Sequence, residues 1–332
     1  MLLTQAAPKA RYSSLSKAGI VTALCLFMMG TAPEASALHN SRSRAAPRFQ
    51  RVEGTSLLGS YLAGHVARAS RDSENAALYF RRALAKDPGN EDILDNAFQL
   101  ELAAGEFEEA RSLAERLVKR EKNNSVAHIF LGLDAFKHKD YARASAHFKS
   151  AGRGSSSDEP TIRLALDWAG IAQGHADKVI ASLRVPGKSA WAAHFEVVQR
   201  AFMADVAKKK AAAEDAYRAA YDKKTPNARI AEAYARHLAF WGDGKAGLSI
   251  LEEADAAGTP LGKALSKELK AGKKPKLMVS NVDEGLAESF LGIGQVLAAN
   301  NGLDAAQIYF RFALFLNPNS DIAKLELAEL YG

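Results

Sequence analysis

The sequence predicts an all-α protein made of stacked helical hairpins, and three observations lead to this fold class. Small and bulky apolar residues recur with a period of 34, turn-forming residues stand between the recurring blocks, and prolines close several of them. In the first block, Ala76, Phe80 and Ala83 lie at i, i+4 and i+7 on one face of a helix. Pro88 cannot continue this helix and therefore ends the unit.

Residues 1–37 are predicted to be a secretory signal peptide. Three basic residues precede the apolar run Ala18–Gly30, and Ala35 and Ala37 complete an A-x-A cleavage pattern. We therefore expect an exported protein, located in the periplasm in a bacterial context. An uncleaved N-terminal membrane anchor stays open as the alternative, although the run is shorter than the ~20 residues that a bilayer span needs.

Residues 38–55 carry four arginines without apolar periodicity and are predicted to be a flexible lead-in. Cleavage after Ala37 removes Cys25, the only cysteine, so the mature chain contains no disulfide. It also removes three basic residues and one acidic residue, which lowers the formal net charge from +6 to +4. This charge is too small to indicate a nucleic-acid-binding protein.

The recurring blocks divide the rest of the chain into units. Steps of 34, 34, 35, 34, 34 and 59 residues connect the block starts Ala76, Ala110, Ala144, Val179, Ala213, Gly247 and Ala306. The last step is one period plus an insertion. We therefore predict repeats one to six in residues 56–260, a basic linker or insertion in 261–286, and repeat seven with half of an eighth in 287–332. A short helix is expected to start at Thr259–Pro260 and to end at Gly272.

A helix–turn–helix unit of this length resembles the tetratricopeptide repeat family. Leu131–Gly132 followed by Ala144, Phe148 and Ala151 carries the resemblance in the third unit, and a similar series surrounds Phe310 in the seventh. The fourth unit departs from the pattern, with Asp167 where the family prefers glycine. The resemblance implies a right-handed superhelix of paired helices, an α-solenoid, whose concave groove is built from the first helices and binds other proteins.

The register of the family places apolar side chains in the groove. The predicted groove positions are Val126, Ile129, Leu133, Phe136, Leu164, Trp168, Ile171, Phe195, Val198 and Phe202. An apolar groove of this kind fits a helix or an extended peptide of a partner protein. The alternative is that the superhelix closes and buries the same residues as core.

No chemistry is expected from the sequence. The eight histidines never stand at i, i+3 or i, i+4, and no nucleophile or phosphate-binding motif is present, so we predict a protein that is not an enzyme and has no metal or cofactor. The expected role is a protein–protein interaction scaffold in the cell envelope. The alternative is the non-catalytic repeat region of a longer envelope enzyme, or a secretion or assembly accessory protein.

The lysines of the insertion predict a weak contact with an anionic partner, and a solvated linker is the alternative reading. These lysines are Lys263, Lys267, Lys270, Lys273, Lys274 and Lys276.

Overall fold

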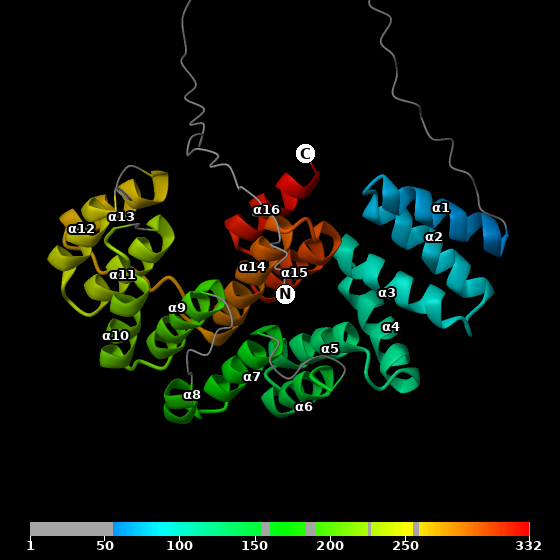
Figure 1. The fold of residues 1–332 in the computed structure, drawn as a ribbon, viewed down its shortest axis with the longest axis horizontal. Helices are drawn as coiled ribbons and strands as arrows, with labels where there is room; N and C mark the ends of the chain where they lie inside the picture. The colour runs from blue at the N-terminus through cyan, green and yellow to red at the C-terminus, as the bar shows by residue number, and fades with distance from the viewer. Residues whose placement is uncertain (1–55, 154–159, 183–189, 225–226, 255–258, 332) are drawn as a thin grey trace, which may run out of the picture. The chain divides into compact units, whose positions relative to one another are not determined.

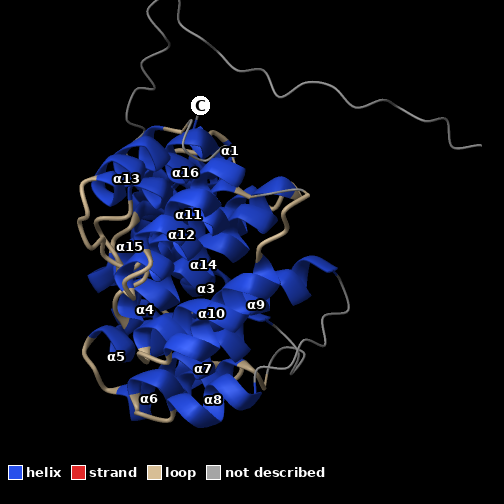
Figure 2. Ribbon diagram, turned by 90° about the vertical axis from the view of Figure 1, so that its left-hand side faces the viewer, coloured by secondary structure: helices blue, strands red, loops and turns tan. Residues whose placement is uncertain are grey.

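The computed structural model describes residues 56–153, 160–182, 190–224, 227–254 and 259–331. Within these ranges the chain forms sixteen helices and no strand, which confirms the predicted all-α class (Figures 1 and 2). The predicted signal peptide (1–37) and lead-in (38–55) lie outside the described residues.

The helices follow one another in chain order with short connections. They are α1 (Leu57–Ala69), α2 (Ser73–Lys86), α3 (Glu91–Ala104), α4 (Phe107–Arg120), α5 (Ser125–Lys137), α6 (Tyr141–Ala151), α7 (Pro160–Ala172), α8 (Ala176–Ser182), α9 (Ala190–Val206), α10 (Lys210–Ala220), α11 (Ala228–Phe240), α12 (Gly244–Glu253), α13 (Pro260–Lys270), α14 (Val282–Ala299), α15 (Leu303–Leu316) and α16 (Asp321–Tyr331).

Seven antiparallel hairpins are formed by α1/α2, α3/α4, α5/α6, α7/α8, α9/α10, α11/α12 and α14/α15, each helix packing on its successor. A glycine on the first helix commonly faces an aromatic ring on the second. A Cβ on Gly64 would stand 2.6 Å from the Phe80 ring, and one on Gly294 would stand 2.6 Å from the Phe310 ring. In both pairs the aromatic residue follows the glycine by sixteen residues. Because glycine has no side chain, the ring can pack directly against the backbone of the first helix, at the same position in both hairpins.

Each hairpin turn contains one residue in the left-handed region. These residues are Arg71, Gly105, Lys139, Gly174, Lys208, Gly242 and Asn301, with φ between 55° and 102°. They are separated by 34, 34, 35, 34, 34 and 59 residues, the same steps that separate the apolar blocks. The next backbone N–H donates to a carbonyl five residues back, as from Asp72 to Ala67, which closes the first helix of the unit. The backbone therefore has the period of the sequence.

Short polar side chains cap the helices at repeating positions. Asp72, Asp140 and Asp243 each accept a hydrogen bond from a backbone N–H in the first turn of a second helix. Asn90 and Asn124, one period apart, do the same for first helices.

The C-terminal hairpin lies on the inner side of the curve that the earlier hairpins follow (Figure 1). Helix α14 packs against α7 and α9, and α15 packs against α3 and α5. Because α14 begins at Val282, residues Val282–Leu286, which the sequence assigned to the insertion, belong to this hairpin. Helix α13 occupies the expected short-helix segment, begins after the Thr259 cap and packs on α11 and α12.

Candidate functional site

Most of the predicted groove residues are covered by protein. Ile129, Leu133, Phe136, Leu164, Trp168, Ile171 and Phe202 are buried, and Val126, Phe195 and Val198 are half-buried. Phe136 packs edge-on against Tyr141 of its own hairpin, with the ring centroids 5.1 Å apart. Whether any of the ten binds a partner stays a prediction, but the third and fourth units do not present an open apolar groove.

Trp168 on α7 shows what covers this part of the inner face. Its indole N–H lies 3.0 Å from Ser289 Oγ on α14 and 3.2 Å from Gln199 Oε1 on α9, and donates to both. Ser289 Oγ in turn donates to Gln199 Oε1 at 2.7 Å. Gly285 lies directly against the indole, so that a Cβ there would overlap the ring. The chain's own seventh hairpin is therefore the occupant of the groove at Trp168.

Phe130 on α5 makes the matching contact with α15. Its ring is stacked with that of Phe312 and lies 5.6 Å from that of Phe315, centroid to centroid. Lys137 donates from Nζ to the Phe315 carbonyl at 2.7 Å. The sequence did not single out Phe130, because α5 is apolar on nearly every side and its pattern indicates no particular face.

Polar contacts fix α15 to the first two hairpins. Gln307 and Arg311 both donate to the carbonyl oxygen of Ala103 at 2.9 Å, and Arg68 pairs with Asp304 at 3.0 Å. The satisfied carbonyl lies at the end of α3, where a helix leaves its last carbonyl groups without intrahelical partners. The seventh hairpin is thus held by both apolar and polar contacts.

One part of the inner face remains open, between α9, α11 and α14. A cleft of about 370 Å³ is present there. Its apolar lining comes from Phe195, Val198, Phe202, Ile230, Leu291 and Val296, and its polar lining from His194, Gln199, Asn227, Arg229, Glu288 and Gln295. All three groove residues predicted in the fifth unit therefore line the cleft. Gly292 admits the Phe195 ring from the opposite wall.

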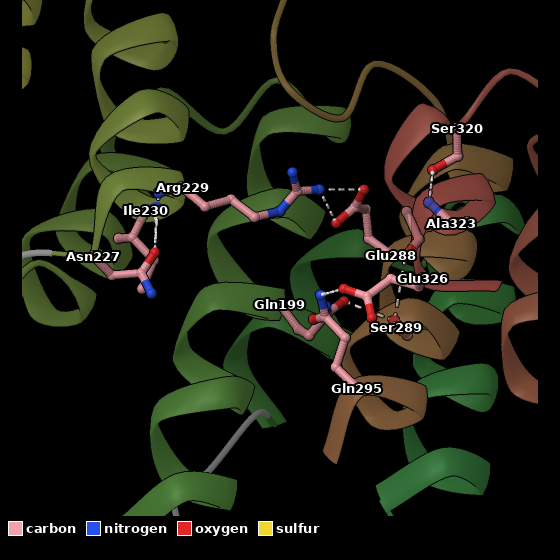
Figure 3. A network of polar contacts seen from close by, with 11 residues as sticks. Gln199, Asn227, Arg229, Ile230, Glu288, Ser289, Gln295, Ser320, Ala323 and Glu326 are labelled. Atoms are coloured by element: carbon pink, nitrogen blue, oxygen red, sulfur yellow. Dashed lines mark hydrogen bonds and ion pairs between the residues drawn. The ribbon is translucent and has the colours of Figure 1, made fainter. Parts of the chain in front are cut away.

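An ion pair crosses the cleft (Figure 3). Arg229 reaches from α11 toward α14, and its Nη2 lies 2.7 and 2.6 Å from the two carboxylate oxygens of Glu288. The side chain of Glu288 is 17% exposed and that of Arg229 is 35% exposed. Asn227 caps α11 by accepting from the backbone N–H groups of Arg229 and Ile230. No sequence pattern marked Arg229 and Glu288 as partners, because 59 residues separate them.

A group of charged side chains lies between α7 and α9. Arg163 pairs with Glu196, which is buried. Burial raises the pKa of Glu196, and Arg163 opposes the rise. Burial also raises the pKa of Asp167 to about 7, while Arg163 lowers it and Glu196 adds to the rise. The departure of Asp167 from the family pattern thus places a carboxyl group where its charged form is disfavoured.

A second polar network lies inside the hairpins next to the cleft. Asp205 accepts a hydrogen bond from Tyr217 OH at 2.8 Å and lies 2.6 Å from Nδ1 of His237. All three side chains are buried. Burial, together with the Asp205 carboxylate, raises the pKa of Tyr217 well above its usual value. The network joins α9, α10 and α11 and so fixes two walls of the cleft relative to each other.

The described ranges contain no group of three or more His, Cys, Asp or Glu that could hold a metal ion. Among the described helices, none has both the length and the apolar character required to cross a bilayer. The six lysines of the predicted anionic contact are all exposed, on α13 and in the segment that follows it.

Comparison with known proteins agrees with the repeat architecture. The tetratricopeptide repeat family model matches residues 67–132. A tetratricopeptide repeat protein from Parabacteroides merdae has a similar fold, with a TM-score of 0.50 and 12% identity over 83% of this chain and 99% of that chain. Comparison with curated proteins finds no match.

Two further solved structures are less similar. The Cut9–Hcn1 hetero-tetramer of the APC/C gives a TM-score of 0.36 at 14% identity, over 85% of this chain and 51% of that chain. Yeast Tom70 gives 0.31 at 12% identity, over 82% and 65%. Residues 67–132 thus match the tetratricopeptide repeat family, and the hairpins before and after the insertion repeat with the same period in a fold similar to that of a tetratricopeptide repeat protein.

Proposed function

We propose that the chain is a non-catalytic scaffold of the cell envelope that holds a peptide or helix of a partner protein in the cleft between α9, α11 and α14. Proteins of this fold generally bind other proteins rather than catalyse reactions. The observation that carries the proposal is the cleft itself. The cleft is an open part of the inner face beside the seventh hairpin, and its lining is mainly apolar.

The chemistry of the lining suits a short amphipathic segment. Phe195, Val198 and Phe202 stand at i, i+3 and i+7 of α9, so they form one continuous apolar wall. The pair Arg229–Glu288 and the amide of Gln295 supply polar groups at its edge, which can orient a bound backbone. A volume of about 370 Å³ is near the lower end of the range for ligand pockets, so a few side chains fill it.

Photo-crosslinking in the producing cell tests this binding role. A photoreactive residue at His194 or Val198, both in the cleft, should give an adduct with one discrete protein. The matched control is Glu115, an exposed residue of α4, which should give no such adduct. Val198→Asp, introduced together with the crosslinker at His194, should abolish the adduct. The substitution places a carboxylate in the apolar wall of the cleft, where an apolar segment of the partner would have to bury it. Equal adducts at the cleft and at Glu115 would contradict the proposal.

Export to the periplasm is part of the same proposal and depends on residues 1–37. The protein recovered from the periplasmic fraction should begin at Leu38 when its N-terminus is sequenced. A chain that keeps Met1 and stays in the membrane fraction would instead support the uncleaved anchor.

A further inference from the structure

We propose that α13 and the segment after it form a second interaction surface, which binds an extended acidic segment of a partner protein. We call it the basic surface and define it by Lys263, Lys267, Lys270, Lys273, Lys274 and Lys276. Residues 260–276 contain these six lysines and one glutamate, a formal charge of +5, whereas the whole chain carries +6. Positive charge is therefore strongly concentrated in this short stretch.

The lysines of the basic surface have no acidic partners within the part of the chain that the structure describes. All six are exposed, and none is within ion-pair distance of a described carboxylate. Other lysines behave differently: Lys209 pairs with Asp177 at 2.7 Å, and Lys223 pairs with Glu253 at 3.2 Å. Uncompensated like charges repel one another, so an anionic partner gains more from this surface than from a mixed one.

The helix that displays these lysines is held rigidly. Leu265 and Leu269 are buried in a small apolar cluster with residues of α11 and α12. The Thr259 hydroxyl caps the first turn by accepting from the N–H of Gly262 at 3.0 Å. Packing of the apolar side of α13 thus fixes the helix face that carries Lys263, Lys267 and Lys270, so the backbone at these positions need not be ordered when a partner binds.

The spacing of the lysines indicates the shape of the partner. Lys263, Lys267 and Lys270 are four and three residues apart, which corresponds to about 6 and about 4.5 Å along a helix axis. Alternate side chains of an extended chain point the same way and are about 6.5 Å apart. Glutamates at every second position of an extended segment can therefore follow this row of lysines. Glu252 is the carboxylate that shares a hollow with these three lysines, so positive charge dominates there.

A second hollow continues the basic surface beyond the end of α13. It has a volume of about 490 Å³ and is lined by Phe240, Trp241, Lys273 and Lys274, among others. Lys274 Nζ lies 4.0 Å, and Lys208 Nζ 5.0 Å, from the centroid of the Phe240 ring. The aromatic ring attracts both cations but carries no net charge, so the two ammonium groups remain available to a carboxylate.

The distribution of apolar side chains favours a protein over a membrane as the partner. The exposed large hydrophobic residues in the described ranges are Leu58, Leu62 and Val66 on α1 and Leu325 and Tyr331 on α16. The basic surface has none of them, so it offers no side chain for insertion into a bilayer, which interfacial helices use together with their charge.

The test uses a labelled peptide of about twelve residues in which Glu and Ser alternate. Its binding to the full chain is measured by fluorescence anisotropy at about 50 and about 200 mM salt. We expect the affinity to fall about tenfold in Lys263→Glu/Lys267→Glu/Lys270→Glu, and less than about twofold in Lys86→Glu/Lys119→Glu/Lys149→Glu. The second variant is a matched control, because it makes the same charge change at exposed lysines in the last turns of three other helices. Circular dichroism checks that both variants are folded.

Each other outcome overturns the proposal. Equal losses in the two variants would mean that net charge alone attracts the peptide, and no binding in low salt would mean that the basic surface is only solvated. If the chain bound phosphatidylserine vesicles but not the peptide, and the first variant lost the vesicle binding, the basic surface would be a membrane-binding surface. Because Val198 lies in the cleft, Val198→Asp should leave the peptide affinity unchanged, and a loss would place the peptide in the cleft instead.

Discussion

Helices α7 and α11 occupy the same position in their hairpins but have different inner faces. On α7, Trp168 is fully buried against Gly285 and Ser289 of α14. On α11, Arg229 contacts the same helix α14 through an ion pair that crosses an open cleft. The repeat pattern therefore specifies how the two helices of a unit pack together, whereas residues outside the pattern determine what covers the inner face.

The largest effect is expected from Gly285→Val, which removes the contact between α7 and α14. The new side chain overlaps the Trp168 indole, which is enclosed on all sides and cannot move away. We expect a loss of about 3 kcal/mol in the free energy of unfolding, measured by urea titration with tryptophan fluorescence. Hydrogen exchange should increase first in α14 and α15.

Gly244→Val is the matched control for this substitution. A Cβ on Gly244, the first residue of α12, has no described atom within 4 Å. The control should change the stability by less than about 0.5 kcal/mol. Similar losses in both variants would show that α14 does not depend on its close approach to Trp168.

The burial of the inner face also affects Asp167, the neighbour of Trp168. Its pKa is about 7 in the folded protein and near 3.8 in the unfolded chain, so folding takes up a proton between these values. Stability therefore falls as the pH rises through this window, and the penalty is complete above pH 7. Asp167→Asn cannot ionise, so it should stabilise the protein by about 2 kcal/mol at pH 8 and much less at pH 4.

Urea titrations at the two pH values measure this difference. The exposed Asp215 on α10 provides the control, because Asp215→Asn should have the same small effect at both pH values. Equal effects of Asp167→Asn at pH 4 and pH 8 would show that the pKa of Asp167 is not raised in the folded protein.

The hairpins could be predicted from the sequence because the interactions that form them are local. Gly64, Ala76 and the Phe80 ring all belong to one hairpin. The left-handed residue in the turn between its two helices recurs with the same period in the other hairpins. The position of the seventh hairpin could not be predicted in this way. Gly285 and Trp168 are 117 residues apart, and neither belongs to a recurring block that would relate one to the other.

Prediction of the candidate site was partial for a related reason. Phe195, Val198 and Phe202 were found because the family register indicates which face of a first helix points inward, and α9 follows that register. The same register also selected Trp168, which α14 covers. The register predicts which side chains of a first helix face inward, but it does not predict whether another helix packs against them. Glu288 was not predicted, because its contact with Arg229 joins two hairpins whose residues are 59 positions apart, and no recurring block relates the two side chains.

A smaller effect is expected where α11 meets α14. Glu288→Gln removes one charge of the pair with Arg229, whose side chain is exposed enough to regain water. We expect a loss of about 1 kcal/mol or less in global stability, but faster hydrogen exchange throughout α11, α12 and α13. Glu326→Gln is the control, because Glu326 accepts a hydrogen bond from Gln295 without a charged partner in the described ranges. Unchanged exchange in α11–α13 would show that the ion pair does not hold this region to α14.

The smallest expected effect tests whether the turns are equivalent in the two regions. Gly174, in the α7/α8 turn, has φ +83°, and a Cβ there meets no described atom within 4 Å. Gly174→Ala should therefore lower the free energy of unfolding by about 0.5 to 1 kcal/mol through backbone conformation alone. An L-residue is strained at this φ, and the smaller conformational freedom of alanine in the unfolded chain offsets only part of that strain. Gly242→Ala, at the same position of the α11/α12 turn and with φ +102°, should lose about as much in the local opening energy of its own hairpin, measured by hydrogen exchange. A clearly larger loss at one of the two turns would mean that the repeat does not set the same backbone geometry under a covered inner face and an open one.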